Sequence, residues 1–178
     1  MCHFYCDILF INKESVFLYN EFENERGGFI KMAMFTINNM NMSLEGHTQA
    51  EILVSLAELA TSLNLVVDRD SLVKDYQERE QESTTGFGNG IAIPHAKSNN
   101  VKTAAILFGR STTDIEWQSL DGKPVNTFIS LLVPANEGDV HLKLLAQLSR
   151  KLVHQDFVEI LKRGDTREVL EIINQAIS

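Results

Sequence analysis

Apolar residues recur every three to four positions in the first half of the chain, the spacing of one face of an α-helix. The pattern predicts a helix over residues 47–63, with Asn64 as its stop. A second helix is expected to run to about Glu82, capped at its start by Asp70 or Ser71.

The same periodicity returns in the last third of the chain and predicts three further helices. Asp139 is placed to cap the first, which carries leucines on one face. The second is short and ends at Gly164, and the third runs from about Thr166 to Ile177.

Apolar runs between these two groups of helices predict strands. One run covers residues 104–109, and a second covers 125–133, with a turn at 120–124 before it. The second run is apolar almost throughout, which indicates a central strand covered on both faces. We therefore expect an α/β fold in which helices flank a mixed β-sheet in a single, three-layer-like domain.

Composition and charge narrow the class of protein. The chain has 178 residues, 44% of them hydrophobic, and a net charge of −8. The acidic balance argues against nucleic acid and anionic membranes as partners and suits a basic protein better. Without a run of about 20 apolar residues or a signal peptide, direct membrane insertion is not expected, and a cytoplasmic location is predicted.

The first 31 residues do not share the periodicity of the rest. Both cysteines, Cys2 and Cys6, lie there, so no disulfide framework is expected. Arg26-Gly27-Gly28 can be encoded by a purine-rich ribosome-binding sequence shortly before Met32 or Met34. Residues 1–31 are therefore interpreted as a non-native translated leader. A native terminal strand or disordered arm is the alternative.

The most informative segment runs from Gly86 to His95 and reads GFGNGIAIPH. Its glycines feed an extended run, not the helix that a dinucleotide or P-loop site requires, so neither type of nucleotide site is expected. We expect a short strand that ends at Pro94 and gives the His95 imidazole a rigid mount. A neutral imidazole can accept a phosphoryl group as a nucleophile.

Two further residues have chemistry that suits such a histidine. His141 lies in the first turn of a predicted helix, where free N–H groups favour an anion, although a structural role at the helix start is the favoured interpretation of this residue taken alone. Arg79 offers a guanidinium suited to phosphoryl oxygens, although a solvated face is the default in a charged helix.

Residues 83–95 resemble the active-site motif of the fructose–mannitol type of enzyme IIA, from the bacterial phosphoenolpyruvate-dependent sugar phosphotransferase system. The resemblance continues through residues 119–125 and 144–149, and covers about 42–178. The sequence of residues 119–125, SLDGKPV, favours the fructose-type branch of the family. The phosphotransferase domain is therefore expected to span residues 32–178.

The resemblance implies roles for individual residues. His95 would be phosphorylated by the phosphocarrier protein HPr and would pass the group to a cysteine of an enzyme IIB that serves a membrane sugar permease. His141 and Arg79 match the second histidine and the arginine of the family's site. Loop residues would border the phosphoryl group, namely Thr84, Thr85, Gly86, Gly88, Asn89 and Gly90. No cofactor or metal is implied.

Two other functions remain open at this point. The same domain type also occurs as a regulatory phospho-switch that binds other proteins without moving sugar. A metal-dependent hydrolase using His95 and His141 is a distant alternative, because no third ligand is apparent.

Overall fold

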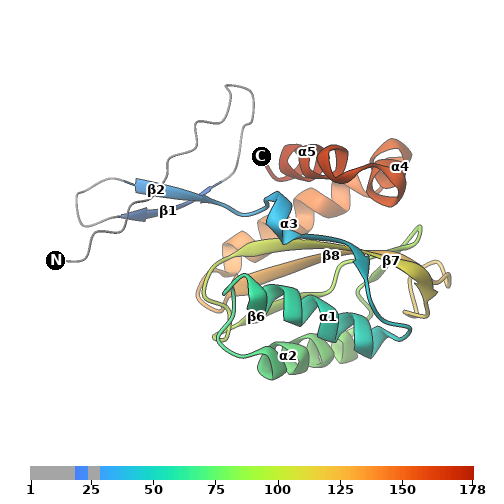
Figure 1. Ribbon diagram of the computed structural model, residues 1–178, viewed down its shortest axis with the longest axis horizontal. Coiled ribbons are helices and arrows are strands. Elements are labelled where there is room, and N and C mark those ends of the chain that lie inside the picture. Colours follow the sequence, from blue (N-terminus) through green and yellow to red (C-terminus); the bar gives the residue numbers. More distant parts are fainter. Residues whose placement is uncertain (1–18, 24–28) are drawn as a thin grey trace.

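The computed structural model describes residues 19–23 and 29–178 (Figure 1). The strands are β1 (Tyr19–Glu23), β2 (Phe29–Ala33), β3 (Met40–Leu44), β4 (Gly86–Gly88), β5 (Ile91–Ala92), β6 (His95–Ser98), β7 (Ala105–Ile115) and β8 (Val125–Pro134). The helices are the 3₁₀ turn η1 (Ile37–Asn39), α1 (Gln49–Ser62), α2 (Arg69–Glu82), α3 (Gly138–Lys151), α4 (Gln155–Arg163) and α5 (Thr166–Ile177).

Strands β1 and β2 form an antiparallel pair separate from the main sheet. Most of the segment interpreted as a translated leader, including Cys2 and Cys6, lies outside the described residues. That interpretation therefore stays a prediction.

The main sheet is mixed and is organised around β8. Its order is β3-β7-β8-β5-β4, and β6 also pairs with β8. The β7–β8 pair is antiparallel, whereas β5 and β6 both run parallel to β8, one after the other along its length. Every residue of β8 except Asn126 is buried, which confirms the predicted central strand.

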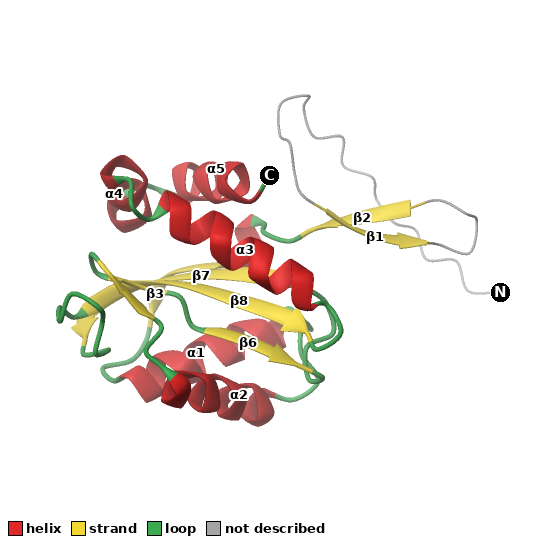
Figure 2. Ribbon diagram, turned by 180° about the vertical axis from the view of Figure 1, so that it is seen from behind, coloured by secondary structure: helices red, strands yellow, loops and turns green. Residues whose placement is uncertain are grey.

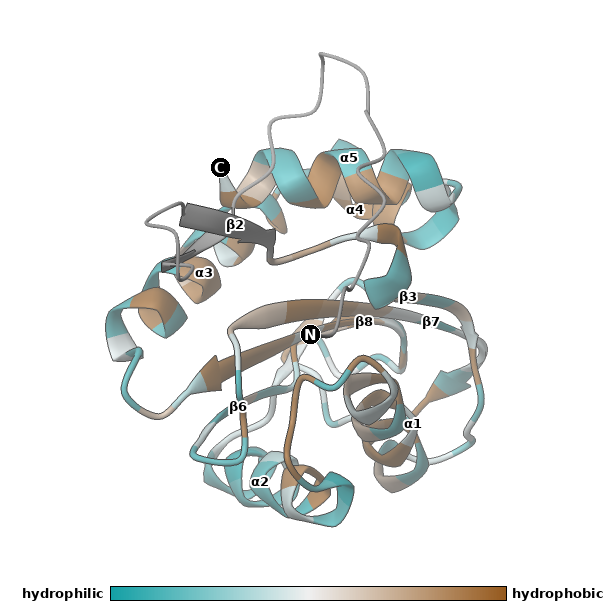
Figure 3. Cartoon of the chain, turned by 60° about the vertical axis from the view of Figure 1, so that its left-hand side comes forward, coloured by the Kyte–Doolittle hydropathy of each residue, from teal (hydrophilic) through white to brown (hydrophobic). Residues whose placement is uncertain are grey.

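Helices cover both faces of this sheet, so the predicted three-layer α/β fold is confirmed. Helices α1 and α2 lie on one face and α3, α4 and α5 on the other (Figures 1 and 2). Each face has its own apolar cluster, one containing Leu56 and Phe128 and the other Leu148 and Ile129. Figure 3 shows the apolar strands between helices whose outer faces are polar. Among the described residues, no helix is long and apolar enough to cross a membrane.

Two helix starts differ from the sequence-based expectation. Helix α2 is capped by Asp68, whose carboxylate accepts from the Ser71 N–H at 2.8 Å, rather than by Asp70 or Ser71 themselves. Helix α3 starts after Glu137, so Asp139 lies within its first turn and is not the cap. In both cases the helix begins before its first periodic apolar residue, because its first residues are not apolar.

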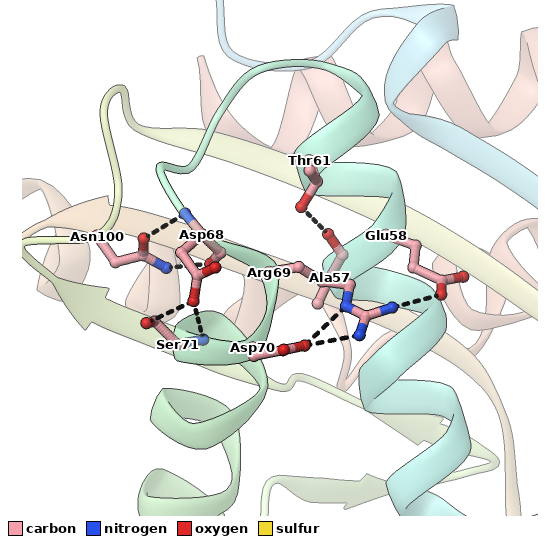
Figure 4. A network of polar contacts seen from close by, with 8 residues as sticks. All are labelled: Ala57, Glu58, Thr61, Asp68, Arg69, Asp70, Ser71 and Asn100. Carbon is pink, nitrogen blue, oxygen red and sulfur yellow. Dashed lines mark hydrogen bonds and ion pairs between the residues drawn. The ribbon is translucent and has the colours of Figure 1, made fainter.

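The connection between α1 and α2 is held by polar contacts on the surface (Figure 4). Asn100 exchanges two hydrogen bonds with the Asp68 backbone, each of 2.8 Å. Arg69 reaches Glu58 on α1 at 3.2 Å and its neighbour Asp70. These ion pairs are exposed to solvent, so they add little to the stability of the domain.

The expectation of one strand ending at Pro94 is wrong in detail. The segment forms β5, then a break at Ile93 and Pro94, and then β6, whose first residue is His95. Pro94 has no N–H to donate, which suits the break. Strand β7 also extends to Ile115, beyond the predicted end at Gly109, and the strand β3 was not predicted at all.

Gly109 on β7 offers a test of how tightly Leu44 of the neighbouring strand β3 packs over it. A Cβ there would overlap Leu44 Cδ1 and lie 2.8 Å from Leu44 Cγ. Overpacking of a core typically costs about 1–3 kcal/mol, so Gly109→Ala should lower the urea midpoint of unfolding. In the double variant with Leu44→Ala the overlap is gone. The loss of stability in the double variant should therefore be smaller than the sum of the losses in the two single variants. A loss equal to that sum would contradict the packing explanation.

Candidate functional site

His95 is the buried centre of the site. It is 7% exposed and pairs with Leu131 at the start of β6. Its Nδ1 lies 2.7 Å from the carbonyl oxygen of Ile93, and its Nε2 accepts a 2.7 Å hydrogen bond from Arg79 Nε. Because the carbonyl can only accept and the guanidinium can only donate, Nδ1 carries the proton and Nε2 carries the lone pair.

Arg79 is held in place at the last turn of α2. Besides its bond to His95, its Nη1 donates to the Ser83 carbonyl oxygen at 2.9 Å and lies 3.3 Å from Ser83 Oγ. The sequence left a solvated face as the default for this arginine. The structure instead brings its guanidinium onto the histidine.

His141 approaches His95 from the opposite layer. Side chains alternate along β6, and Ala96 belongs to the apolar cluster on the side of α1 and α2, so His95 faces the layer of α3. The His141 ring centroid lies 5.1 Å from that of His95, with the rings inclined at 48°. His141 Nε2 is buried without a hydrogen-bond partner, so this atom is free to bind an incoming group.

The environment keeps both imidazoles neutral. Burial lowers the pKa of His95 from 6.5 to about 4; the hydrogen bond to Ile93 opposes this shift, and the charges of Arg79 and His141 contribute smaller effects in the same direction as burial. Burial also lowers the pKa of His141, and the charges of Lys97 and Arg79 act in the same direction. A neutral His95 keeps the Nε2 lone pair that nucleophilic attack requires.

The two threonines predicted to border the phosphoryl group are bound to other protein groups. The Thr85 carbonyl oxygen accepts from the Ile93 N–H at 2.9 Å, and the Thr85 hydroxyl is bound by Glu80 and Trp117. Thr84 Oγ1 donates to the Trp117 carbonyl oxygen at 3.1 Å. Both residues therefore hold the loop next to the histidine, and their contact with a phosphoryl group stays a prediction.

The glycine-rich tip lies away from His95. Gly90 bonds to Thr127, four positions before Leu131 on β8, which corresponds to about 13 Å along a strand. Asn89 is exposed, and its N–H donates to Asp121 at 2.9 Å. Gly88 has a φ of +108°, and a Cβ on Gly86 would lie 2.7 Å from Ser119 Cα. These contacts give the glycines a structural reason. Phosphoryl binding by Gly86, Gly88, Asn89 and Gly90 stays a prediction.

Sequence reasoning missed two charged residues near the site. Glu80 follows Arg79 in a charged stretch of helix, where nothing distinguishes a bound carboxylate from a solvated one. Lys97 lies two positions after His95 on the same strand, so strand alternation places it on the same face. In the described part of the chain, no three His, Cys, Asp or Glu residues gather as a metal site.

Comparison with known proteins shows the family to which the chain belongs. The model of the family "Phosphoenolpyruvate-dependent sugar phosphotransferase system, EIIA 2" matches residues 33–176. The chain is 35% identical over 147 residues to the fructose-like EIIA component of Escherichia coli, covering 83% of this chain and 99% of the relative. It is 40% identical over 116 residues to the fructose-specific EIIA component of Haloferax volcanii, covering 65% of this chain and 75% of the relative.

Solved structures show the same fold. The nitrogen regulatory protein IIA-Ntr of Neisseria meningitidis superposes with a TM-score of 0.73 at 26% identity, covering 79% of this chain and 96% of that one. A complex of the mannitol enzyme IIA with phosphorylated enzyme IIB from E. coli gives a TM-score of 0.66 at 18% identity, covering 78% and 96%. Since the family model spans most of the chain, the chain belongs to the EIIA 2 family and is a phosphoryl carrier of the phosphoenolpyruvate-dependent sugar phosphotransferase system.

Proposed function

We propose that Nε2 of His95 is the atom that carries the phosphoryl group, taken from phospho-HPr and passed to a cysteine of an enzyme IIB. The observation that carries the proposal is the bonding of the two ring nitrogens. The Ile93 carbonyl fixes the proton on Nδ1, so the lone pair is on Nε2, where the Arg79 guanidinium covers it.

In the first transfer, the Nε2 lone pair attacks phosphorus. An Nε2–P bond forms while the bond from phosphorus to the donor atom of HPr breaks, and that bond's electron pair leaves with the donor. Arg79 moves from Nε2 to the phosphoryl oxygens, and the free Nε2 of His141 donates to another oxygen. Positioning and charge stabilisation of this kind dominate phosphoryl transfer.

In the second transfer, a cysteine thiolate of enzyme IIB attacks the same phosphorus from the opposite side. An S–P bond forms, the Nε2–P bond breaks, and its electron pair returns to Nε2. The proton stays on Nδ1, hydrogen-bonded to the Ile93 carbonyl oxygen, so the leaving group is a neutral imidazole. The enzyme IIB serves the permease of a fructose-like sugar, and the protein acts in the cytoplasm. The fructose-type relatives support this choice of sugar class.

A regulatory role is the second candidate. It is favoured by the likeness to nitrogen regulatory proteins, one of them, from Pseudomonas aeruginosa, 30% identical over 129 residues. In that case phosphorylation of His95 would govern binding to another protein. Rapid transfer from phospho-His95 to an enzyme IIB thiol separates the transport role from the regulatory one.

Replacement of His95 tests the proposal directly. With purified enzyme I, HPr and phosphoenolpyruvate, the wild-type chain should acquire one acid-labile phosphoryl group, mapped by mass spectrometry to His95. His95→Ala should acquire none, because the substitution removes the Nε2 lone pair that Arg79 covers.

His154→Ala is the matched control, because His154 is exposed at the start of α4, and it should be labelled at the wild-type rate. Undiminished labelling of His95→Ala would refute the assignment.

His141 is expected to assist transfer rather than to carry the group. His141→Ala should fold and be labelled on His95, but should pass the group to enzyme IIB about 10²-fold more slowly, since one donor to the phosphoryl oxygens is lost. Rapid-quench measurement of single-turnover transfer gives the rate. A normal rate would leave His141 with a structural part only.

The lowered pKa of His95 predicts its behaviour on titration. A histidine with the ordinary pKa of about 6.5 is half protonated at that pH, whereas His95 should remain neutral down to about pH 5. Ring ¹⁵N signals in the folded protein should therefore change with a midpoint near pH 4, and in urea near 6.5. A midpoint above 6 in the folded protein would contradict the neutral nucleophile.

A further inference from the structure

Glu80 lies next to Arg79 in the sequence, and both of its carboxylate oxygens accept hydrogen bonds. The proposed transfer steps give this carboxylate no role. Its Oε1 accepts from the Thr85 backbone N–H at 2.8 Å, and its Oε2 accepts from the Thr85 hydroxyl at 2.6 Å. Both carboxylate oxygens are thus committed to one residue, five positions further along the chain. This pairing joins the last turn of α2 to the loop that precedes β4.

Thr85 is fixed from a second direction by Trp117. The indole Nε1 of Trp117, a residue only 1% exposed, donates to Thr85 Oγ1 at 3.2 Å. Because the indole can only donate, the single hydroxyl proton of Thr85 must point to Glu80. Thr85 is therefore held through its N–H and its hydroxyl, and its carbonyl remains free to bind elsewhere.

That carbonyl leads to the catalytic histidine. The Thr85 carbonyl oxygen accepts from the Ile93 N–H at 2.9 Å, and the Ile93 carbonyl oxygen lies 2.7 Å from His95 Nδ1. An unbroken series of hydrogen bonds thus runs from Glu80 through Thr85 and Ile93 to the ring nitrogen opposite the reacting one. Arg79, the residue before Glu80, binds the other ring nitrogen.

We infer that Glu80 is a positioning residue that sets the proton of His95 on Nδ1, by holding Thr85 and through it the carbonyl of Ile93. This role rests on the proposed function of His95. Ile93 and Pro94 form the break between two strands, where no sheet partner fixes the Ile93 carbonyl. The bond from Thr85 to the Ile93 N–H supplies that restraint.

The chemical consequence affects both transfer steps. If the Ile93 carbonyl turns away, the Nδ1 proton can move to Nε2, and that form of the ring has no lone pair at the reacting atom. In the phosphorylated state, the same carbonyl stabilises the proton that makes imidazole a good leaving group. A loosened carbonyl should therefore slow acceptance and donation without weakening the docking of HPr.

The experiment reads the tautomer in the unphosphorylated protein and the kinetics separately. Long-range ¹H–¹⁵N spectra of the wild type at pH 7 should show a protonated Nδ1 and an unprotonated Nε2 for His95. In Glu80→Ala the two ¹⁵N shifts should move toward each other, and kcat for labelling by phospho-HPr should fall about ten- to a hundredfold, with KM changed less than about twofold.

Three further variants make the result decisive. Glu82→Ala removes the same charge from an exposed position at the same helix end and should match the wild type in both measurements. Glu80→Gln keeps one acceptor for the Thr85 N–H and should lie between wild type and Glu80→Ala. Thr85→Val keeps the backbone bonds, removes the hydroxyl, and decides the matter if Glu80→Ala fails to fold.

The outcomes distinguish this inference from the function on which it rests. Wild-type ring shifts in folded Glu80→Ala, or in folded Glu80→Gln and Thr85→Val, would overturn the role of Glu80 while leaving His95 as the carrier. A rise in KM with unchanged kcat would overturn it as well. Absence of label on His95 in the wild type would instead overturn the proposed function, whatever the tautomer.

Discussion

The pairing of β8 with two successive short strands is the constraint on which the site depends. Strand β8 is covered on both faces, so its register cannot slip without moving apolar side chains to the wrong layer. Strand β5 pairs with its first half and β6 with its second half. The break between them, at Ile93 and Pro94, lies directly before His95, and there the Pro94 carbonyl oxygen still accepts from the Leu131 N–H of β8 at 3.1 Å.

This break explains why a histidine can be both buried and reactive. A histidine inside a continuous strand would project its ring from one face, with its backbone committed to the ladder. Here the Ile93 carbonyl is available to bind Nδ1, and the ring edge with Nε2 turns toward Arg79. Burial then keeps the ring neutral, because a protonated imidazole there would be poorly solvated and close to a cation.

The layers and the central strand could be predicted from apolar periodicity, because those signals come from burial. The identity of His95, Arg79 and His141 came from the motif and its spacing. The function of the glycines could not be obtained in this way. The sequence alone does not distinguish a glycine that avoids a clash with the Ser119 backbone from a glycine that lets the backbone approach a phosphate. Contacts such as those of Glu80 with Thr85 depend on side-chain direction, which no periodicity records.

The adjacency of Arg79 and Glu80 shows how one helix end can control both nitrogens of a ring. Consecutive residues on a helix point about 100° apart, so the two side chains diverge toward different partners. In the proposed transfer, Arg79 must be free to move, since it follows the phosphoryl group. The anion must not move, since it holds Thr85 against the strand break. Arg79 accordingly binds Nε2 of His95 directly. Glu80 instead acts on Nδ1 through two buried residues, Thr85 and Ile93.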